Sequence, residues 1–210
     1  MSGLREMVLL CEIGFQSQIA LRAGERLKAT ENSSDRLDVW SSIQTILIAT
    51  GIVSRILWPT NKKNENRGKI LRKILKVDEN NILSDRTFRN HFEHYEERIE
   101  EWFQNHPTEA YVDLAMNPSL SGTIENCHRG YNSFNKTLVF RGKLLDLNQI
   151  LKALEDISKK SVHFYLCLIH LVAYAKQPLR AVCNNCYTWF VYRIFLDGQT
   201  LSARAFENSK

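Results

Sequence analysis

The sequence predicts a mainly α-helical protein, an antiparallel helical bundle with a small β-hairpin insertion and a β-containing C-terminal tail. Through most of the 210 residues, apolar side chains recur every three or four positions, as they do on the buried face of a helix. Two such segments near the N-terminus exceed twenty residues, a length typical of a bundle. Between residues 108 and 145 this period gives way to turn signals and short β-type runs.

The predicted helices of the first half are long and have recognisable ends. The first two cover residues 4–27 and 35–57, where Ser34 is placed to cap the second helix and Pro59 lies beyond its end. A polar, basic loop and a short basic helix over about 69–75 follow. A strong helix is then predicted over 85–104, with Ser84 as its cap.

The region after this helix changes character. Residues 111–115 are typical of a strand, and residues 137–145 are typical of a small hairpin. The pairs at 117–118, 121–122 and 129–130 are turn signals. We therefore expect a β-containing insertion between helices.

The last predicted helix covers residues 147–175, with Asp146 as its cap and Pro178 beyond its end. Together these elements predict one helical domain over residues 1–176, with the insertion at about 108–145. Residues 177–210 would form a C-terminal tail or appendage with a β-rich stretch.

The five cysteines form an odd and scattered set, which is typical of a reduced cytoplasmic protein. We expect no signal peptide, and because the sequence has no uninterrupted run of roughly eighteen apolar residues, we expect no membrane span. Cys183 and Cys186 have the spacing of metal ligands, and Cys127 and His128 could complete a zinc site. We favour free thiols, and expect no metal and no other cofactor.

Positive charge gathers in one segment of a chain whose formal net charge is +5. Seven lysines and arginines fall between positions 62 and 76, where Glu65 is the only acidic residue. This segment favours an anionic partner such as RNA, although a solvated surface is the alternative. No aromatic side chains alternate with the charges, which argues against a stacking platform for single strands. The candidate RNA-binding residues are Lys62, Lys63, Arg67, Lys69, Arg72 and Lys73.

The most informative motif lies on the helix predicted over 85–104. Arg89 is followed at once by the polar Asn90, and His94 comes after four intervening residues. Arginine stays cationic and can hold a phosphate, while histidine can move a proton near neutral pH. The stripe of this helix expected to face the core comprises Phe88, Phe92, Tyr95, Ile99, Trp102 and Phe103.

On an unbroken helix the motif would lie on the solvent-facing side, opposite the buried stripe, with Arg89 and His94 about 140° apart around the helix axis. One helix cannot easily close both side chains onto a single phosphate. Two such helices around a two-fold axis could do so, each supplying an arginine and a histidine to a shared cleft.

This pattern resembles the HEPN family, whose nucleases carry an arginine, an adjacent polar residue and a histidine four to six residues later. The resemblance covers residues 1–105 and 147–175. It implies a dimeric, metal-independent endoribonuclease, of a kind that includes toxins and antiviral effectors, with a separate antitoxin or inhibitor protein as a possible partner. By this resemblance His94 acts as general base or acid, Arg89 stabilises charge on the transition state, and Asn90 orients the pair or the phosphate.

The alternative is a catalytically inactive HEPN-like module that binds RNA or protein. Glu93 follows Arg89 by four residues, so the arginine could simply form an ion pair on the helix surface. Five glutamates between positions 93 and 101 make this helix acidic, which disfavours a nearby RNA backbone. RNA cleavage without divalent metal, and its loss on replacing His94, would separate the two hypotheses.

Overall fold

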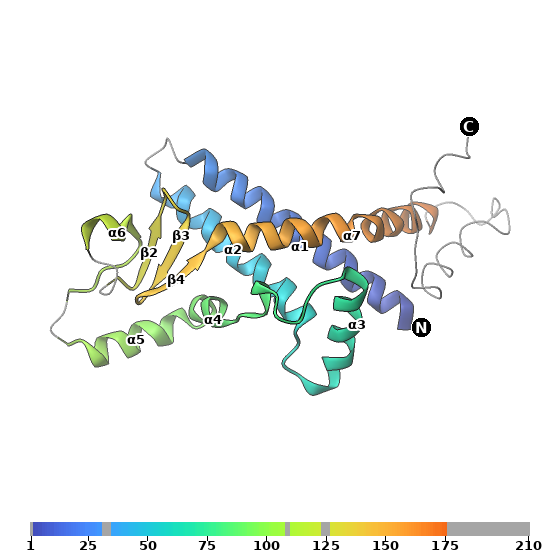
Figure 1. Ribbon diagram of the computed structural model, residues 1–210, viewed down its shortest axis with the longest axis horizontal. Helices are drawn as coiled ribbons and strands as arrows, with labels where there is room; N and C mark the ends of the chain where they lie inside the picture. Colours follow the sequence, from blue (N-terminus) through green and yellow to red (C-terminus); the bar gives the residue numbers. More distant parts are fainter. Residues whose placement is uncertain (1, 31–34, 108–109, 123–126, 176–210) are drawn as a thin grey trace.

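The computed structural model describes residues 2–30, 35–107, 110–122 and 127–175. Three long helices form its body: α1 (Ser2–Ala29), α2 (Arg36–Leu57) and α7 (Leu147–Ala175). Helix α1 packs along both α2 and α7 (Figure 1). The predicted β-rich tail, with Cys183 and Cys186, lies outside the described residues.

Helix α2 begins at a side-chain cap and ends near a proline, as expected for a helix of this length. The carboxylate of Asp35 accepts hydrogen bonds from the backbone nitrogens of Leu37 and Asp38 at 2.9 and 3.2 Å, so Asp35 is the cap. The predicted cap, Ser34, lies outside the described residues. Helix α2 is long and apolar enough to cross a membrane, but 56% of the relevant window is buried inside the protein, as in the core helix of a bundle.

The basic segment forms a 3-10 turn (Lys62–Asn64) followed by α3 (Glu65–Leu75), a longer helix than predicted. Helix α3 ends at Lys76, whose backbone is left-handed at φ 49°. The buried side of α3, with Leu71 and Leu75, packs on α2. Its lysines are thereby held on the surface.

The prediction of one unbroken helix over residues 85–104 is wrong. The structure has α4 (Thr87–Glu93) and α5 (Tyr95–Asn105), separated by His94 at φ −115° and ψ 43°. The predicted cap, Ser84, belongs to a 3-10 turn, and Asp85 accepts the hydrogen bond from the backbone nitrogen of Thr87 at 2.8 Å. Tyr95, which follows this junction, bonds to Tyr111 and Asp113 just before β1, as described below.

The expected aromatic stripe is only partly buried. Trp102 is fully packed, whereas Phe92, Tyr95 and Ile99 are half-buried. Phe103 is exposed and stacks on Tyr111 with ring centroids 5.2 Å apart. The side chain of Phe88 lies outside the described part of the structure.

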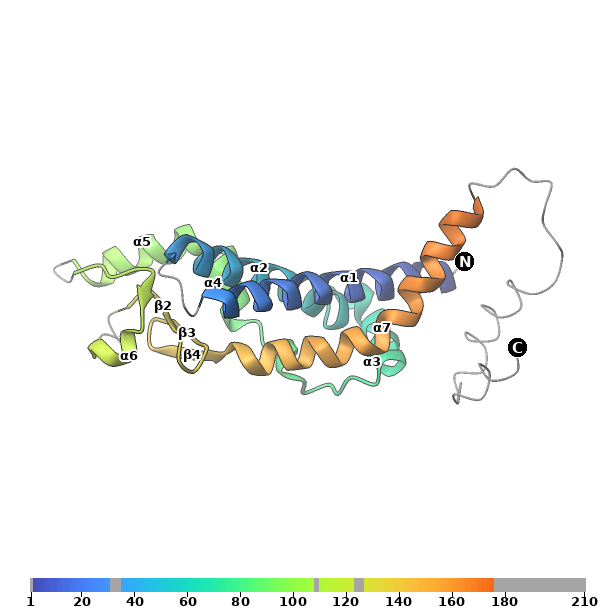
Figure 2. The same cartoon turned by 90° about the horizontal axis from the view of Figure 1, so that it is seen from above.

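The β region forms a four-stranded sheet in the order β1-β2-β3-β4, with β1 (Ala115–Met116), β2 (Arg129–Asn132), β3 (Thr137–Phe140) and β4 (Lys143–Asp146). Strands β1 and β2 are parallel, and the other neighbours are antiparallel. A short helix, α6 (Pro118–Ser121), lies between β1 and β2 in the sequence. Viewed from above, the sheet lies at one end of the helices (Figure 2).

The predicted hairpin is confirmed, because β3 and β4 pair through a two-residue turn in which Arg141 and Gly142 have positive φ. Two other expectations of this region are wrong. The strand expected over 111–115 is reduced to β1 and an isolated bridge, and the Arg129-Gly130 pair begins β2 instead of forming a turn. A Cβ at Gly130 would lie 2.7 Å from Cγ of Pro118, so this glycine permits a close approach of α6.

Candidate functional site

The motif lies on α4 and at the junction that follows it. Helix α4 packs on α2 and lies between α3 and α5 along one edge of the molecule (Figure 1). Asn90 is exposed, and the side chain of His94 is 52% exposed. Arg89 belongs to α4, but its side chain lies outside the described part of the structure.

The bend at His94 changes the geometry expected for the motif. Because the backbone leaves helical angles at this residue, the separation of about 140° calculated for an unbroken helix does not apply. The junction is still hydrogen-bonded on both sides, since the His94 nitrogen donates to the Asn90 oxygen at 3.1 Å and the Arg98 nitrogen donates to the His94 oxygen at 3.2 Å. The imidazole therefore projects from a defined point of the backbone.

One carboxylate lies beside this imidazole, and another acidic residue, Glu93, precedes His94 in the sequence. Nδ1 of His94 lies 3.6 Å from Oε1 of Glu97. Glu93 forms an ion pair with Arg55 of α2, which joins the end of α4 to the outward side of α2. An exposed imidazole can exchange protons with solvent or substrate, whereas the neighbouring carboxylates repel phosphate.

Behind the junction lies a hydrogen-bonded network that sequence reasoning missed. The Tyr95 hydroxyl donates to Oδ2 of Asp113 at 2.6 Å and lies 2.9 Å from the Tyr111 hydroxyl. Arg129 donates from Nε and Nη2 to the two carboxylate oxygens of Asp113 at 2.9 and 2.6 Å. The Arg129 guanidinium also lies 3.7 Å from the centre of the Tyr95 ring.

Hydrogen bonds and burial set the protonation states in this network. Burial favours the neutral form of Asp113, but the hydrogen bonds from Arg129 and Tyr95 outweigh it and lower the pKa of this carboxyl below its usual value. Burial and the bond to Asp113 raise the pKa of Tyr95. The network is therefore a carboxylate and a guanidinium joined to neutral phenols, and it fixes Tyr95 directly after His94.

Cys127 and His128 lie beneath this network as packed groups. His128 is fully buried, with its ring 5.4 Å from that of Tyr95 and 5.0 Å from that of Phe140. Burial raises the pKa of the Cys127 thiol to about 11, and the thiol donates to the Arg129 oxygen at 2.8 Å. Among the residues that the structure describes, no cluster of histidine, cysteine and acidic side chains could hold a metal ion.

The side chains of the predicted RNA-binding residues differ in how far they are exposed to solvent. Lys62, Lys63, Lys69 and Lys73 are exposed, and Lys69 pairs with Glu65 at 2.7 Å. Arg67 is half-buried. Arg72 is buried, donates to the Leu57 oxygen and lies over the Trp58 ring at 5.6 Å, so it supports the packing of α3 on α2.

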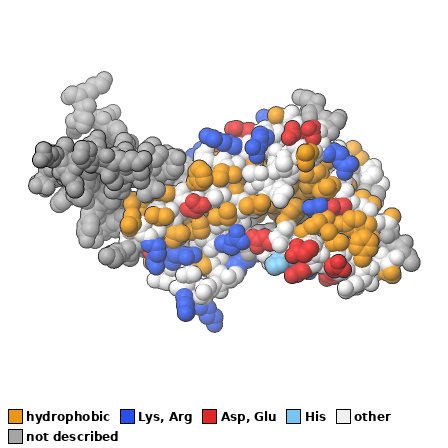
Figure 3. All heavy atoms as spheres, turned by 180° about the vertical axis from the view of Figure 1, so that it is seen from behind, with side chains coloured by type: hydrophobic (Ala, Val, Ile, Leu, Met, Phe, Trp, Pro, Cys, Tyr) orange, Lys and Arg blue, Asp and Glu red, His pale blue; other side chains and the backbone are white. Residues whose placement is uncertain are grey.

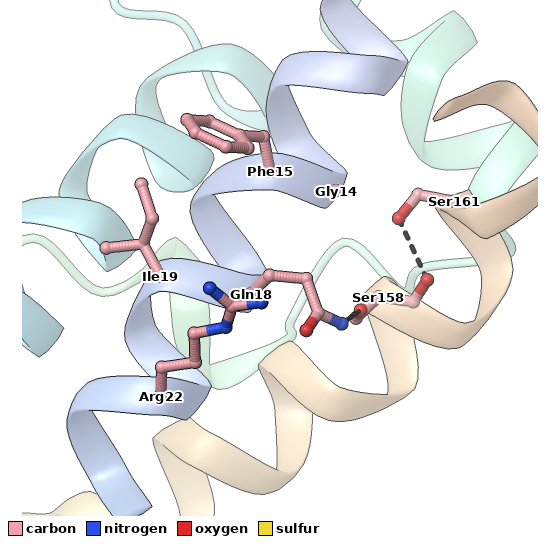
Figure 4. Close-up of a pocket in the computed structure, with 7 residues that line it drawn as sticks. All are labelled: Gly14, Phe15, Gln18, Ile19, Arg22, Ser158 and Ser161. Carbon is pink, nitrogen blue, oxygen red and sulfur yellow. Dashed lines mark hydrogen bonds between the residues drawn. The ribbon is translucent and has the colours of Figure 1, made fainter. Parts of the chain in front are cut away.

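A groove of about 380 Å³ lies between α1 and α7. Gln18 crosses it and donates to the Ser158 hydroxyl at 2.5 Å (Figure 4). None of the motif residues lines this groove. Its other lining residues are Gly14, Phe15, Ile19, Arg22 and Ser161.

Comparison of the chain with protein-family models, with curated proteins and with solved structures finds no match in any of the three. The site is therefore interpreted from its own residues and geometry.

Proposed function

We propose that this protein is a metal-independent endoribonuclease of HEPN type, acting as a toxin or antiviral effector. Its catalytic residues are Arg89, Asn90 and His94. The observation that carries the proposal is the position of His94, whose imidazole is more than half exposed directly after the helix that bears Arg89 and Asn90. A histidine used only for packing would be buried, as His128 is.

In the proposed reaction the chain supplies both proton transfer and charge stabilisation. His94 accepts the proton of the ribose 2′-hydroxyl as the 2′-oxygen attacks the adjacent phosphorus, or donates a proton to the departing 5′-oxygen. Arg89 stabilises the negative charge that develops on the phosphate oxygens, and Asn90 orients the phosphate. A second copy of the chain supplies the other histidine and arginine, so that different copies serve as base and acid.

The basic segment supports RNA as the substrate. Lys62, Lys63, Lys69 and Lys73 present exposed ammonium groups near one end of the edge that carries α4. They can neutralise phosphates of the same RNA and so offset the carboxylates around His94. A separate inhibitor protein would be needed to keep such an enzyme silent in its host.

Cleavage of RNA in the presence of EDTA tests the proposal. The purified protein should cut total cellular RNA or transfer RNA, and His94→Ala should remove this activity without changing circular dichroism or the melting temperature. His91→Ala is the matched control, because it removes a histidine of α4 to which the motif assigns no role. The proposal fails if His94→Ala cleaves like the unmodified protein.

The second candidate is a catalytically inactive HEPN-like module that binds RNA or protein. The proximity of Glu97 to His94, at 3.6 Å, favours it because the carboxylate repels a scissile phosphate. Under this alternative the unmodified protein leaves RNA intact. If RNA is its ligand, binding should weaken steeply with salt and on Lys63→Glu.

A further inference from the structure

Helix α3 presents to solvent a face that combines apolar and basic side chains. Ile70 and Ile74 are one turn apart on this face and are 40% and 37% exposed. At about 100° per residue, Lys73 lies on one side of the two isoleucines and the half-buried Arg67 lies on the other. The outward face of a surface helix is normally polar, so neighbouring exposed isoleucines between cationic side chains mark an interaction surface.

The opposite face of α3 is already used by the fold. Leu71 and Leu75 are fully buried. Arg72 is buried as well and donates a hydrogen bond to the Leu57 oxygen at the end of α2. Because these contacts fix the rotation of α3 about its axis, the isoleucines stay on the outside. A partner can therefore contact them without any unfolding of the protein.

This face lies on a part of the molecule that an extended surface can reach. Helix α3 and the turn before it project from the body of long helices (Figure 1), and the view from behind shows basic side chains on this projection (Figure 3). Glu65 pairs with Lys69 at 2.7 Å, and the acidic Asp78 and Glu79 come only after the end of the helix. The projection therefore keeps a positive charge, carried by the exposed lysines Lys62, Lys63, Lys69, Lys73 and Lys76.

We propose that this face binds the surface of an anionic lipid membrane, with α3 lying along the headgroups. The lysines contact lipid phosphates and carboxylates, and Ile70 and Ile74 enter the boundary between headgroups and acyl chains. The methylene stems of the lysines lie beside the isoleucines while the ammonium groups stay at the headgroups. The helix rests on the membrane and does not cross it, because its 11 residues extend over about 16 Å, roughly half of the hydrocarbon core.

The isoleucines favour a membrane over RNA as the partner of this face. Ammonium groups bind the phosphates of RNA and of lipids alike. Single-stranded RNA gains further affinity by stacking bases on aromatic rings, and residues 62–76 contain no aromatic side chain. Exposed isoleucines add nothing to phosphate binding, whereas their transfer from water into lipid is favourable. A membrane therefore accounts for both kinds of side chain on the face.

The first experiment measures sedimentation of the full chain with lipid vesicles. The protein should bind vesicles of phosphatidylcholine with phosphatidylserine, and should not bind vesicles of phosphatidylcholine alone. Binding should weaken as the salt concentration rises, because salt screens the attraction between lysines and headgroups. RNA is absent from the assay, so its result does not depend on the proposed ribonuclease activity.

A pair of substitutions tests the apolar part of the face. Ile70→Ser with Ile74→Ser should weaken binding to the mixed vesicles by at least about tenfold, because the side chains no longer gain from entering the lipid. The matched control is Leu120→Ser with Leu144→Ser. These leucines are 78% and 58% exposed on α6 and β4, outside α3, and their replacement should leave binding unchanged.

A second pair tests the basic part of the face. Lys63→Gln with Lys73→Gln should weaken binding by about 25-fold, since each lysine near an anionic surface contributes about fivefold. The matched control, Lys28→Gln with Lys143→Gln, removes the same charge from exposed positions outside α3 and should weaken binding by less than about threefold. Circular dichroism verifies that every variant is folded.

Each outcome supports or overturns the proposal. It is overturned by a protein that binds neither kind of vesicle, by one that binds both equally, or by an isoleucine pair that binds like the unmodified protein. The last result would reduce the face to a binding site for phosphates alone. Vesicle binding by a protein that leaves RNA intact contradicts the ribonuclease and supports the membrane site, while RNA cleavage without vesicle binding does the reverse.

Discussion

Replacing Asp113 with alanine should destabilise the protein by about 3 kcal/mol. Asp113 and Arg129 are each 17% exposed and form two hydrogen bonds with one another. Removing the carboxylate leaves the guanidinium charge largely desolvated, and breaking a buried ion pair from one side costs about 3–5 kcal/mol. Because both side chains keep some contact with solvent, we expect a cost near the lower end of this range. The Tyr95 hydroxyl also loses its acceptor, although Tyr111 stays within hydrogen-bonding distance.

Urea unfolding, followed by circular dichroism, measures the effect. The comparison is Arg55→Ala, which breaks an ion pair whose side chains are 52% and 38% exposed and should cost less than about 1 kcal/mol. Adding Arg129→Leu to Asp113→Ala should cost less than the two single changes summed, because the uncompensated charge is gone. The reasoning is refuted if Asp113→Ala costs no more than Arg55→Ala.

The same substitution tests whether the network holds the junction that carries the motif. Without Asp113, the bend between α4 and α5 loses the contact that anchors Tyr95. Hydrogen exchange at the Arg98 amide, which donates to the His94 oxygen, should then accelerate more than exchange in the middle of α2. Equal protection of Arg98 in both proteins would show that the network does not control the junction.

Three further predictions concern a close contact of α3, the pH dependence of stability and the reactivity of a buried cysteine. Gly68→Ala should destabilise the protein by more than about 1 kcal/mol, although alanine has the higher helix propensity, because the new Cβ would lie 2.6 Å from the Leu57 oxygen. The control is Asn66→Ala on the exposed side of α3, which should leave the free energy of unfolding unchanged in the same urea titration. The pKa of Asp113 is lowered in the folded state, so the stabilisation that its carboxylate gives is present above about pH 4 and is lost as the pH falls below that value. Below about pH 4, the urea concentration at the midpoint of unfolding should therefore decrease less steeply with falling pH in Asp113→Asn than in the unmodified protein. The buried Cys127, with its pKa raised to about 11, should resist iodoacetamide at about pH 8 in the native protein and react in denaturant, as peptide mass mapping would show.

The spacing of apolar residues along the sequence was sufficient to predict the long helices. The period of apolar residues predicted a helix over 147–175, and the structure has α7 at Leu147–Ala175 with Asp146 bonded to the second backbone nitrogen of the helix. The α3–α5 region was harder, because its helices are short and tertiary contacts decide their ends. Helix α3 begins four residues before the predicted position, and Glu65 and Lys69 pair within its first turns.

Contacts between distant residues explain what the sequence pattern did not predict. A helical period continues through His94, yet the bond from Tyr95 to Asp113, 18 positions later, accompanies a bend at this point. Strand β2 was missed because Arg129 and Gly130 have the composition of a turn. Their actual roles depend on Asp113 and on Pro118, which a local window does not relate to them.

The acidic character of α5 bears directly on the proposed ribonuclease. Glu96, Glu97 and Glu100 are exposed on the helix that begins directly after His94, and their charges would repel an RNA phosphate from the imidazole. The exposed lysines of the basic segment, among them Lys63 and Lys73, would have to offset this repulsion by binding other phosphates of the same RNA. The acidic helix would therefore make cleavage depend on the basic segment as well as on the motif.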